Sequence, residues 1–131
     1  EPEYWDGKGW SAKRKEATQI SQRFFAENLM QPVYLHDRWI SVVKVDGFSG
    51  EEVVIDVADN PWGPWTTVDR FVYEPRSGIT AKNSYQPIIL PWSNPDDGLI
   101  IVISENAHDW PVALENPELY RPSVITRPWP D

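Results

Sequence analysis

The sequence predicts an all-β protein made of two antiparallel blades that form the C-terminal part of a β-propeller. A Gln-Pro-Val-Tyr-Leu segment at residues 31–35 is echoed 55 residues later by Gln-Pro-Ile-Ile-Leu at residues 86–90. Runs of consecutive apolar residues follow each copy, which indicates strands buried on both faces. The 13 prolines among 131 residues leave little room for long helices. Short antiparallel sheets that are covered on both faces and repeat along the chain are typical of propeller blades.

The first unit, residues 30–75, contains four expected strands. The Gln-Pro segment is the inner strand, and a polar turn at residues 36–38 leads into the second strand at residues 39–45. The third strand covers residues 53–58, and the fourth covers residues 66–73 after a Pro-Trp-Gly-Pro-Trp corner. Asp56 lies inside the apolar third strand, and we interpret it as structural because a buried charge needs a partner.

The second unit, residues 76–131, contains three expected strands and no room for a fourth. After the inner strand and a polar turn at residues 94–98, the second strand covers residues 99–104 and the third covers residues 121–127. Residues 1–29 are interpreted as the end of a preceding blade and a connection, in which Ser11 caps one short helical turn. A propeller needs about four blades or more to close, so we expect the remaining blades on another chain or a cleaved segment.

Composition and charge exclude several classes of function. The net charge of −8 argues against nucleic-acid binding, which needs a positive surface. No apolar run is long enough to span a membrane, and no signal-peptide pattern opens the chain. The chain has no cysteine, and its two histidines lack metal-ligand spacing, so we expect no metal and no cofactor. The eight tryptophans exceed the needs of a small core, and stacking on sugar rings is one use for the surplus.

Several motifs resemble those of propeller glycoside hydrolases. The stretch at residues 58–65, with its Gly-Pro-Trp corner, resembles arabinanase- and levansucrase-type propellers. Together with Tyr-Trp-Asp-Gly at residues 4–7, Tyr-Gln-Pro at 85–87 and Tyr-Arg-Pro at 120–122, it resembles the extracytoplasmic five-bladed family associated with endo-D-arabinanases, formerly a domain of unknown function. The family domain is more than twice as long as this chain.

The resemblance implies part of a secreted or cell-envelope glycoside hydrolase that acts on an arabinan-like cell-wall polysaccharide. It also implies that the catalytic carboxylates lie in earlier blades, outside this chain, which would supply substrate-binding loops and ring closure. A non-catalytic carbohydrate-binding or scaffolding propeller is the main alternative. A free-standing β-sandwich module that binds sugar through its tryptophans is a further one.

Loops at one end of the blades are where a propeller binds its ligand, and here they cover residues 27–30, 46–50, 82–85 and 106–117. Asp46 and Glu105 each end the second strand of a unit, so they are the candidate catalytic pair. Glycoside hydrolysis needs two carboxyls ~5–10 Å apart, although an acidic residue at a strand end is also commonly just solvated.

Amide, hydroxyl and aromatic side chains in the same loops are the candidate sugar-binding groups. The candidates are Asn83, Ser84, Tyr85, Gln86, Asn106, His108 and Trp110. The alternative role of the first four residues is turn formation and edge capping, and the alternative role of Trp110 is to fill the loop with its ring.

Overall fold

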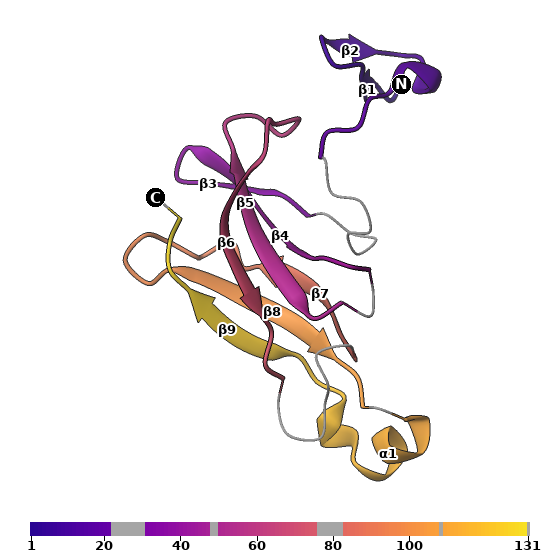
Figure 1. Ribbon diagram of the computed structural model, residues 1–131, viewed down its shortest axis with the longest axis vertical. Coiled ribbons are helices and arrows are strands. Elements are labelled where there is room, and N and C mark those ends of the chain that lie inside the picture. Colours follow the sequence, from indigo (N-terminus) through magenta and orange to yellow (C-terminus); the bar gives the residue numbers. More distant parts are fainter. Residues whose placement is uncertain (22–30, 48–49, 76–82, 108, 131) are drawn as a thin grey trace.

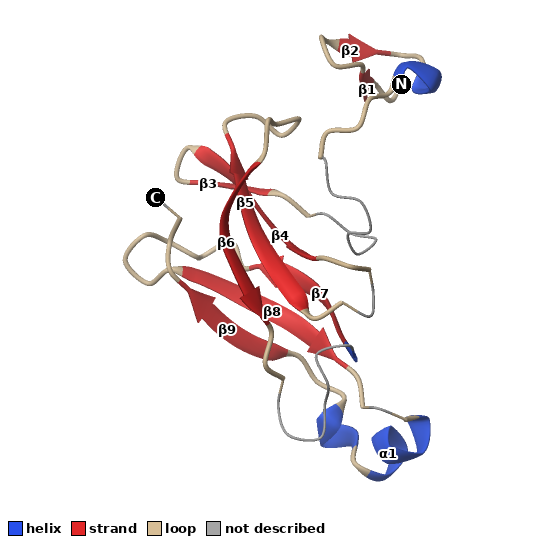
Figure 2. Ribbon diagram, viewed as in Figure 1, coloured by secondary structure: helices blue, strands red, loops and turns tan. Residues whose placement is uncertain are grey.

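The computed structural model of the chain describes residues 1–21, 31–47, 50–75, 83–107 and 109–130. These residues form two antiparallel sheets and a separate two-stranded hairpin, as Figures 1 and 2 show. The first sheet has the order β3-β4-β5-β6, with bounds Val33–Leu35, Arg38–Lys44, Glu52–Ala58 and Thr66–Val72. The second sheet has the order β7-β8-β9, with bounds Ser84–Ile89, Leu99–Glu105 and Ser123–Arg127. The all-β class and the antiparallel order of both units are therefore confirmed.

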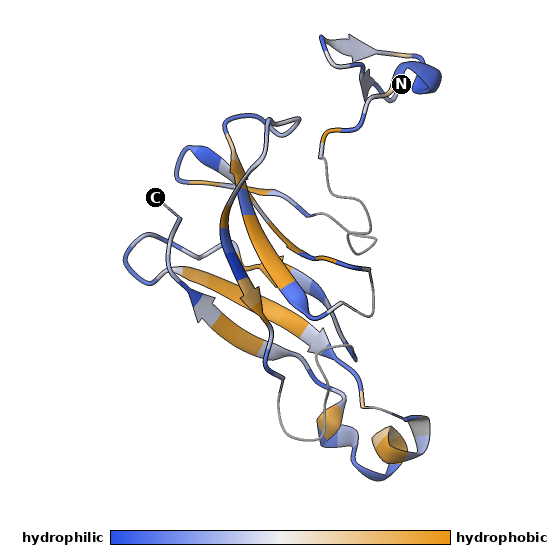
Figure 3. Cartoon of the chain, in the orientation of Figure 1, coloured by the Kyte–Doolittle hydropathy of each residue, from blue (hydrophilic) through white to orange (hydrophobic). Residues whose placement is uncertain are grey.

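The two central strands of the first sheet are buried on both faces, as the sequence predicts. Ile40 and Val42 of β4 face the second sheet, whereas Val43 points to the opposite face, and all three are at most 2% exposed. Val54 of β5 pairs with Val43 across the strands and is also buried. Figure 3 shows the resulting hydrophobic band along β4 and β5.

The main hydrophobic core lies between the two sheets, which pack face to face with β4 against β7. Side chains from every second position of the central strands interdigitate there, which is the pattern expected for stacked sheets. The core consists of Ile40, Val42, Val53, Ile55, Tyr73, Ile89, Leu99, Ile101 and Ile103.

The second sheet departs from the expectation that its central strand is buried on both faces. Along β8, Leu99, Ile101 and Ile103 are buried, but Ile100 and Val102 between them are only partly buried. The prediction for this strand was wrong because the first sheet covers only one of its faces within the described part of the chain. We call the other side the open face, formed by Tyr85, Ile88, Ile100, Val102, Ser104, Val124 and Thr126.

Two tight turns use consecutive residues in the left-handed region of the backbone. His36 and Asp37 have φ values of 46° and 64° between β3 and β4, and Asp46 and Gly47 have 65° and 71° after β4. Paired left-handed residues match the right-handed twist of the flanking strands, so they favour hairpins. These turns fix the register that places the apolar residues of β4 in the core.

The N-terminal residues form a hairpin of their own, with β1 at Tyr4–Trp5 and β2 at Trp10–Ser11. The Trp5 ring stacks on Trp62 of the Pro-rich corner, with ring centroids 4.7 Å apart, and Trp10 meets the same ring edge-on. The backbone turns tightly at this corner, where Gly63 has a φ of 90°. Trp62 and Trp65 are half-buried, and Trp62 packs against the hairpin.

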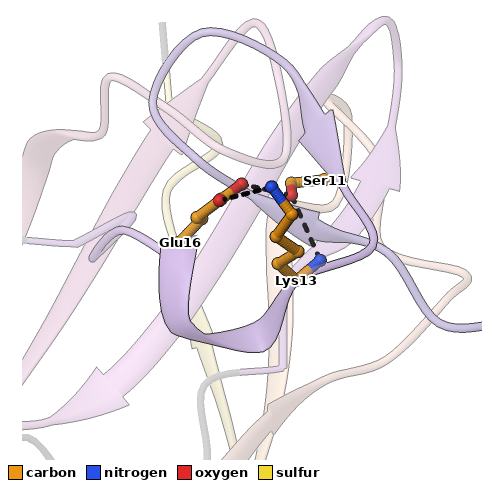
Figure 4. Close-up of polar contacts among 3 residues, drawn as sticks. All are labelled: Ser11, Lys13 and Glu16. Carbon is orange, nitrogen blue, oxygen red and sulfur yellow. Dashed lines mark hydrogen bonds and ion pairs between the residues drawn. The ribbon is translucent and has the colours of Figure 1, made fainter.

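One short helical turn, η1 at Arg14–Glu16, follows the hairpin as predicted. Figure 4 shows the polar contacts that hold it, in which the Ser11 hydroxyl donates to the Glu16 carboxylate at 2.7 Å. The backbone N–H of Lys13 donates to Ser11 Oγ, and the Lys13 ammonium pairs with Glu16 at 3.0 Å. Ser11 thus accepts from the backbone at the start of the turn.

A six-residue helix that the sequence analysis did not predict, α1 at Trp110–Glu115, lies beyond the end of β8 (Figure 1). It is followed by the short turn η3 at Pro117–Leu119. Pro111 in the first turn and Asp109 before it are residues that favour the start of a helix. The sequence analysis missed this helix because it treated the prolines only as evidence against helices. Within the described part of the chain, neither this helix nor any other is long and apolar enough to cross a membrane.

Candidate functional site

The loops expected to form a binding surface lie at one end of the two sheets. β4 ends at Lys44 and β7 begins at Ser84, and the Lys44 ammonium donates a hydrogen bond to the Ser84 carbonyl oxygen. β8 ends at Glu105 at the same end, where its carboxylate meets the Tyr73 hydroxyl beyond β6. The loops that follow β4 and β8 and the one that precedes β7 therefore converge, and residues 27–30 lie outside the described residues.

Glu105 is held inside the protein between the two sheets. Its carboxylate accepts hydrogen bonds from the Tyr73 hydroxyl and from Ser123 Oγ, the latter at 2.9 Å. Only 2% of the residue is exposed, and Lys44 at the same end is 1% exposed. Buried charges are stable only when hydrogen-bonded, and these contacts supply that need. The arrangement is that of a polar clamp that joins the sheets.

Asp46, the other candidate carboxylate, is exposed and occupies the turn after β4 with a φ of 65°. Aspartate tolerates left-handed backbone better than most residues, so a turn role explains its presence. Since Asp46 faces solvent and Glu105 is buried, the two carboxyls do not share one accessible surface. The geometry of the pair gives no support for catalysis, and the catalytic role stays a sequence-based prediction.

Tyr85, Asn106 and Tyr120 form a cluster at the loop end of the open face, and we call it the tyrosine cluster. The Tyr85 hydroxyl donates to Asn106 Oδ1 at 3.4 Å and is also hydrogen-bonded to Tyr120 and Ser104. Tyr120 is 54% exposed. Among the described residues, Asn106 Nδ2 donates no hydrogen bond, so an amide donor and an exposed tyrosine both lie next to the Tyr85 hydroxyl.

The environment of Tyr85 raises the pKa of its hydroxyl above the usual value. Partial burial is the largest cause, followed by the hydrogen bond and electrostatic interaction with Tyr120, while Ser104 and Asn106 act in the opposite direction. The hydroxyl therefore stays protonated at neutral pH and serves as a hydrogen-bond donor.

The other predicted binding residues are placed in different roles. Asn83 caps the loop, since its Nδ2 donates to the Ala107 carbonyl at 3.3 Å and its carbonyl accepts the Asn106 N–H at 3.0 Å. Ser84 is buried against the first sheet. Gln86 lies in the bulge of β7 with a φ of 50° and is half-buried. His108 and the side chain of Trp110 lie outside the described part of the structure.

Tyr120 is the functional candidate that the sequence analysis missed as a binding residue. Its Tyr-Arg-Pro segment was used as a family motif, but the residue was assigned to no loop near the site. The helix α1 and the turn η3 bring the chain back so that Tyr120 meets Tyr85. Only knowledge of this unpredicted helix would have placed the two tyrosines together.

A hollow of about 420 Å³ lies on the far face of the first sheet. Asp56 lines it, is 2% exposed, and accepts a hydrogen bond from Thr67 Oγ1 at 2.7 Å. The interpretation of Asp56 as a partnered structural residue is supported. The partner Thr67 lies on β6, which is the neighbouring strand of the same sheet. Trp65 also lines the hollow, and its buried indole N–H has no hydrogen-bond partner among the residues that the structure describes.

The described residues contain no group of three or more histidine or carboxylate side chains able to hold a metal ion. Comparison of the chain with protein-family models, with curated proteins and with solved structures finds no match. The tyrosine cluster and the buried clamp are therefore interpreted from their geometry.

Proposed function

We propose that this chain supplies two adjacent blades of a β-propeller glycoside hydrolase of the secreted or cell-envelope type, and that the tyrosine cluster binds its polysaccharide, an arabinan-like polymer. The observation that carries the proposal is that the exposed Tyr120 and the Asn106 amide both lie beside the Tyr85 hydroxyl, and that Asn106 Nδ2 donates no hydrogen bond within the described part of the chain. A phenol ring offers an apolar platform with a polar tip, and sugars present apolar C–H faces and hydroxyls. Two four-stranded or nearly four-stranded meanders stacked face to face are consistent with neighbouring blades.

The catalytic carboxylates are proposed to lie outside these residues, on the remaining blades. Burial of Glu105 in the clamp favours this division of labour, because a general acid must reach the glycosidic oxygen. The same observation favours a second candidate function, in which the chain belongs to a carbohydrate-binding or scaffolding β protein without catalysis.

Binding of arabinan oligosaccharides to the full chain, measured by isothermal titration calorimetry, tests the proposal. We expect Tyr120→Ala to weaken binding about fivefold, since loss of an aromatic contact is worth about 1 kcal/mol. Tyr34→Ala is the matched control, because Tyr34 is also 54% exposed but lies beside Trp39, at the opposite end of the sheets. Absence of binding, or equal losses in the two variants, would refute a sugar site at the cluster.

Hydrolysis of the same oligosaccharides by the chain alone tests whether the catalytic carboxylates lie outside it. We expect no cleavage, and we expect Asp46→Asn to leave binding unchanged because Asp46 lies on an exposed turn. Cleavage that disappears in Asp46→Asn would place a catalytic carboxylate in this chain and overturn the proposed division.

A further inference from the structure

Two hollows lie at the end of the sheets opposite the tyrosine cluster, where β8 begins and β9 ends (Figure 1). Their volumes are about 430 and 460 Å³, and Arg127, Pro128 and Trp129 line both of them. Asp69 of β6 also lines the first hollow, and Asp96 of the turn before β8 also lines the second. Because the hollows share three residues, they flank the same tryptophan. Hollows of this size are typical of small-molecule sites.

Trp129 is held in place by the first sheet. The His36 ring meets the Trp129 ring edge-on, with ring centroids 5.1 Å apart and planes at 83°. The Arg38 guanidinium donates a hydrogen bond at 2.9 Å to the carbonyl oxygen of Pro130, which fixes the backbone just after the tryptophan. Trp129 is half-buried and packs against the core between the sheets, while it also lines the two hollows. A ring that is fixed before binding loses little conformational freedom when a ligand stacks on it.

The turn between β7 and β8 brings two carboxylates to the same place. Asn94 Oδ1 accepts the backbone N–H of Asp96 at 3.0 Å and that of Asp97 at 3.1 Å. Gly98 ends the turn with a φ of 86°, and a Cβ atom at this position would lie 2.4 Å from the Arg127 carbonyl oxygen. Glycine therefore allows the turn to approach the end of β9, where Asp96 and Asp97 line the hollow beside Arg127.

The hollows carry charges of both signs, which argues for a neutral ligand. Arg127 Nε donates to Asp69 Oδ2 at 2.8 Å, and the guanidinium lies over the Phe71 ring, 4.3 Å from its centroid. Asp96 is exposed, and within the described part of the chain no hydrogen bond reaches its carboxylate. An anionic ligand would be repelled by the carboxylates, and a cationic ligand would be repelled by the fixed guanidinium. A neutral ligand with several hydroxyls can instead bond to both kinds of group.

We infer that the two hollows form a second carbohydrate-binding site, which takes a neutral sugar residue. In this site the Trp129 ring stacks on the C–H face of the sugar, and the Asp96 carboxylate accepts a hydrogen bond from a sugar hydroxyl. The Arg127 guanidinium, which has further N–H groups besides those bonded to Asp69, donates to a sugar oxygen. The inference goes beyond the proposed function, because it does not require the tyrosine cluster to bind sugar.

Two-dimensional ¹⁵N NMR of the full chain, in which each tryptophan indole N–H gives its own signal, tests the inference. Trp129→Phe identifies the Trp129 signal by removing it. We expect neutral arabinan and glucan oligosaccharides, titrated to high millimolar concentration, to shift this signal. The shift should persist in Tyr120→Ala, because that variant alters only the tyrosine cluster at the other end of the sheets.

Asp96→Ala should weaken the binding measured at the Trp129 signal at least about fivefold, because a hydrogen bond to a charged acceptor is lost. Asp59→Ala is the matched control, since Asp59 is also exposed and follows β5 at the same end of the sheets but does not line either hollow. We expect this control to leave the binding unchanged. Circular dichroism checks that both variants are folded, and Asp96→Asn with Asp59→Asn replaces any alanine pair that is not.

A Trp129 signal that no oligosaccharide shifts overturns the inference, as do equal effects of the two aspartate variants. A shift caused by the cationic peptide trilysine and not by the sugars also overturns it, because the site would then select charge. The two proposals fail separately. Loss of sugar binding at the tyrosine cluster leaves the response of Trp129 in place, and a silent Trp129 leaves the effect of Tyr120→Ala in place.

Discussion

The two sheets share a strand pattern but differ in how they are covered. The central strands of the first sheet are buried on both faces, whereas β8 of the second sheet alternates between buried and partly exposed residues. All three strands are nearly continuous apolar runs in the sequence. The comparison teaches that an apolar run indicates that both faces of a strand are suited to burial. The neighbouring elements decide which of those faces is in fact buried.

The sheets also differ in where they carry polar groups. The first sheet buries Asp56 on its far face, where its carboxylate accepts a hydrogen bond from Thr67 of the neighbouring strand β6. The second sheet instead turns Glu105 inward, where its carboxylate accepts hydrogen bonds from Tyr73 and Ser123. Glu105 therefore links the two sheets, and Asp56 links two strands of one sheet. Removal of the Glu105 carboxylate should therefore weaken the packing of the two sheets against each other.

Glu105→Ala is expected to have the largest effect on the comparison. Removal of the carboxylate leaves the hydroxyls of Tyr73 and Ser123 without this acceptor inside the protein, so the free energy of unfolding should fall by about 2–4 kcal/mol. Urea unfolding followed by circular dichroism measures it. Asp46→Asn, at an exposed turn, should change stability by less than about 0.5 kcal/mol. A stable Glu105→Ala variant would show that Glu105 is not a structural clamp.

Truncation of one valine on the outer face of each sheet is the direct test of the different coverage. Val54→Ala in the first sheet should cost about 1.5–2.5 kcal/mol, since the side chain is fully buried. Val102→Ala on the open face should cost less than about 1 kcal/mol in the monomer, because part of its side chain already meets water. Equal losses of unfolding free energy in the two variants, measured by urea titration at low protein concentration, would mean that the open face is covered in solution.

Separation of the N-terminal hairpin from the first sheet is expected to have a smaller effect. Trp5 and Trp62 stack at 4.7 Å, and such aromatic pairs contribute about 1 kcal/mol beyond the area they bury. A double-mutant cycle with Trp5→Ala and Trp62→Ala should therefore give a coupling energy of about 1 kcal/mol. Additive losses would show that the two rings act independently.

The smallest expected effect concerns the titration of Tyr85 in the second sheet. Because Tyr120 helps to raise the pKa of Tyr85, Tyr120→Phe should lower that pKa, as followed by the ultraviolet absorbance of tyrosinate. A raised folded pKa means that the native state holds its proton longer than the unfolded chain does. Its stabilising contribution is complete below the unfolded value of about 10 and is lost as pH rises further. Tyr85→Phe should remove this alkaline loss, and an unchanged pKa in Tyr120→Phe would show that the two hydroxyls are uncoupled.

Much of the fold was predictable from local patterns. Polar turns before β4 and β8, with His36–Asp37 as the clearest case, separate apolar runs rich in β-branched residues. The boundaries of β4, β5, β6 and β8 agree with the predicted ones within one residue. The helix α1 was missed because six residues are too few to show a helical period, although Pro111 marks its first turn.

The candidate site was predictable as a set of loops but not as a set of contacts. The repeat places Asn83, Tyr85 and Asn106 at one end of the sheets, and there the structure brings them together. It does not reveal that Ser84 and Glu105 turn inward, because strand alternation is ambiguous beside the bulge at Gln86. Nor does it reveal Tyr120, which depends on the path of the chain through α1.

By itself the sequence determined the order of the strands, the antiparallel pairing within each unit and the end of the sheets at which the loops meet. These features follow from short-range patterns of turns and apolar runs, which act over a few residues. The tertiary structure alone decided that Glu105 is a buried clamp, that Tyr85 meets Tyr120, and that one sheet keeps an open face. Burial and long-range contact depend on which elements stack against each other, and no local pattern records that choice.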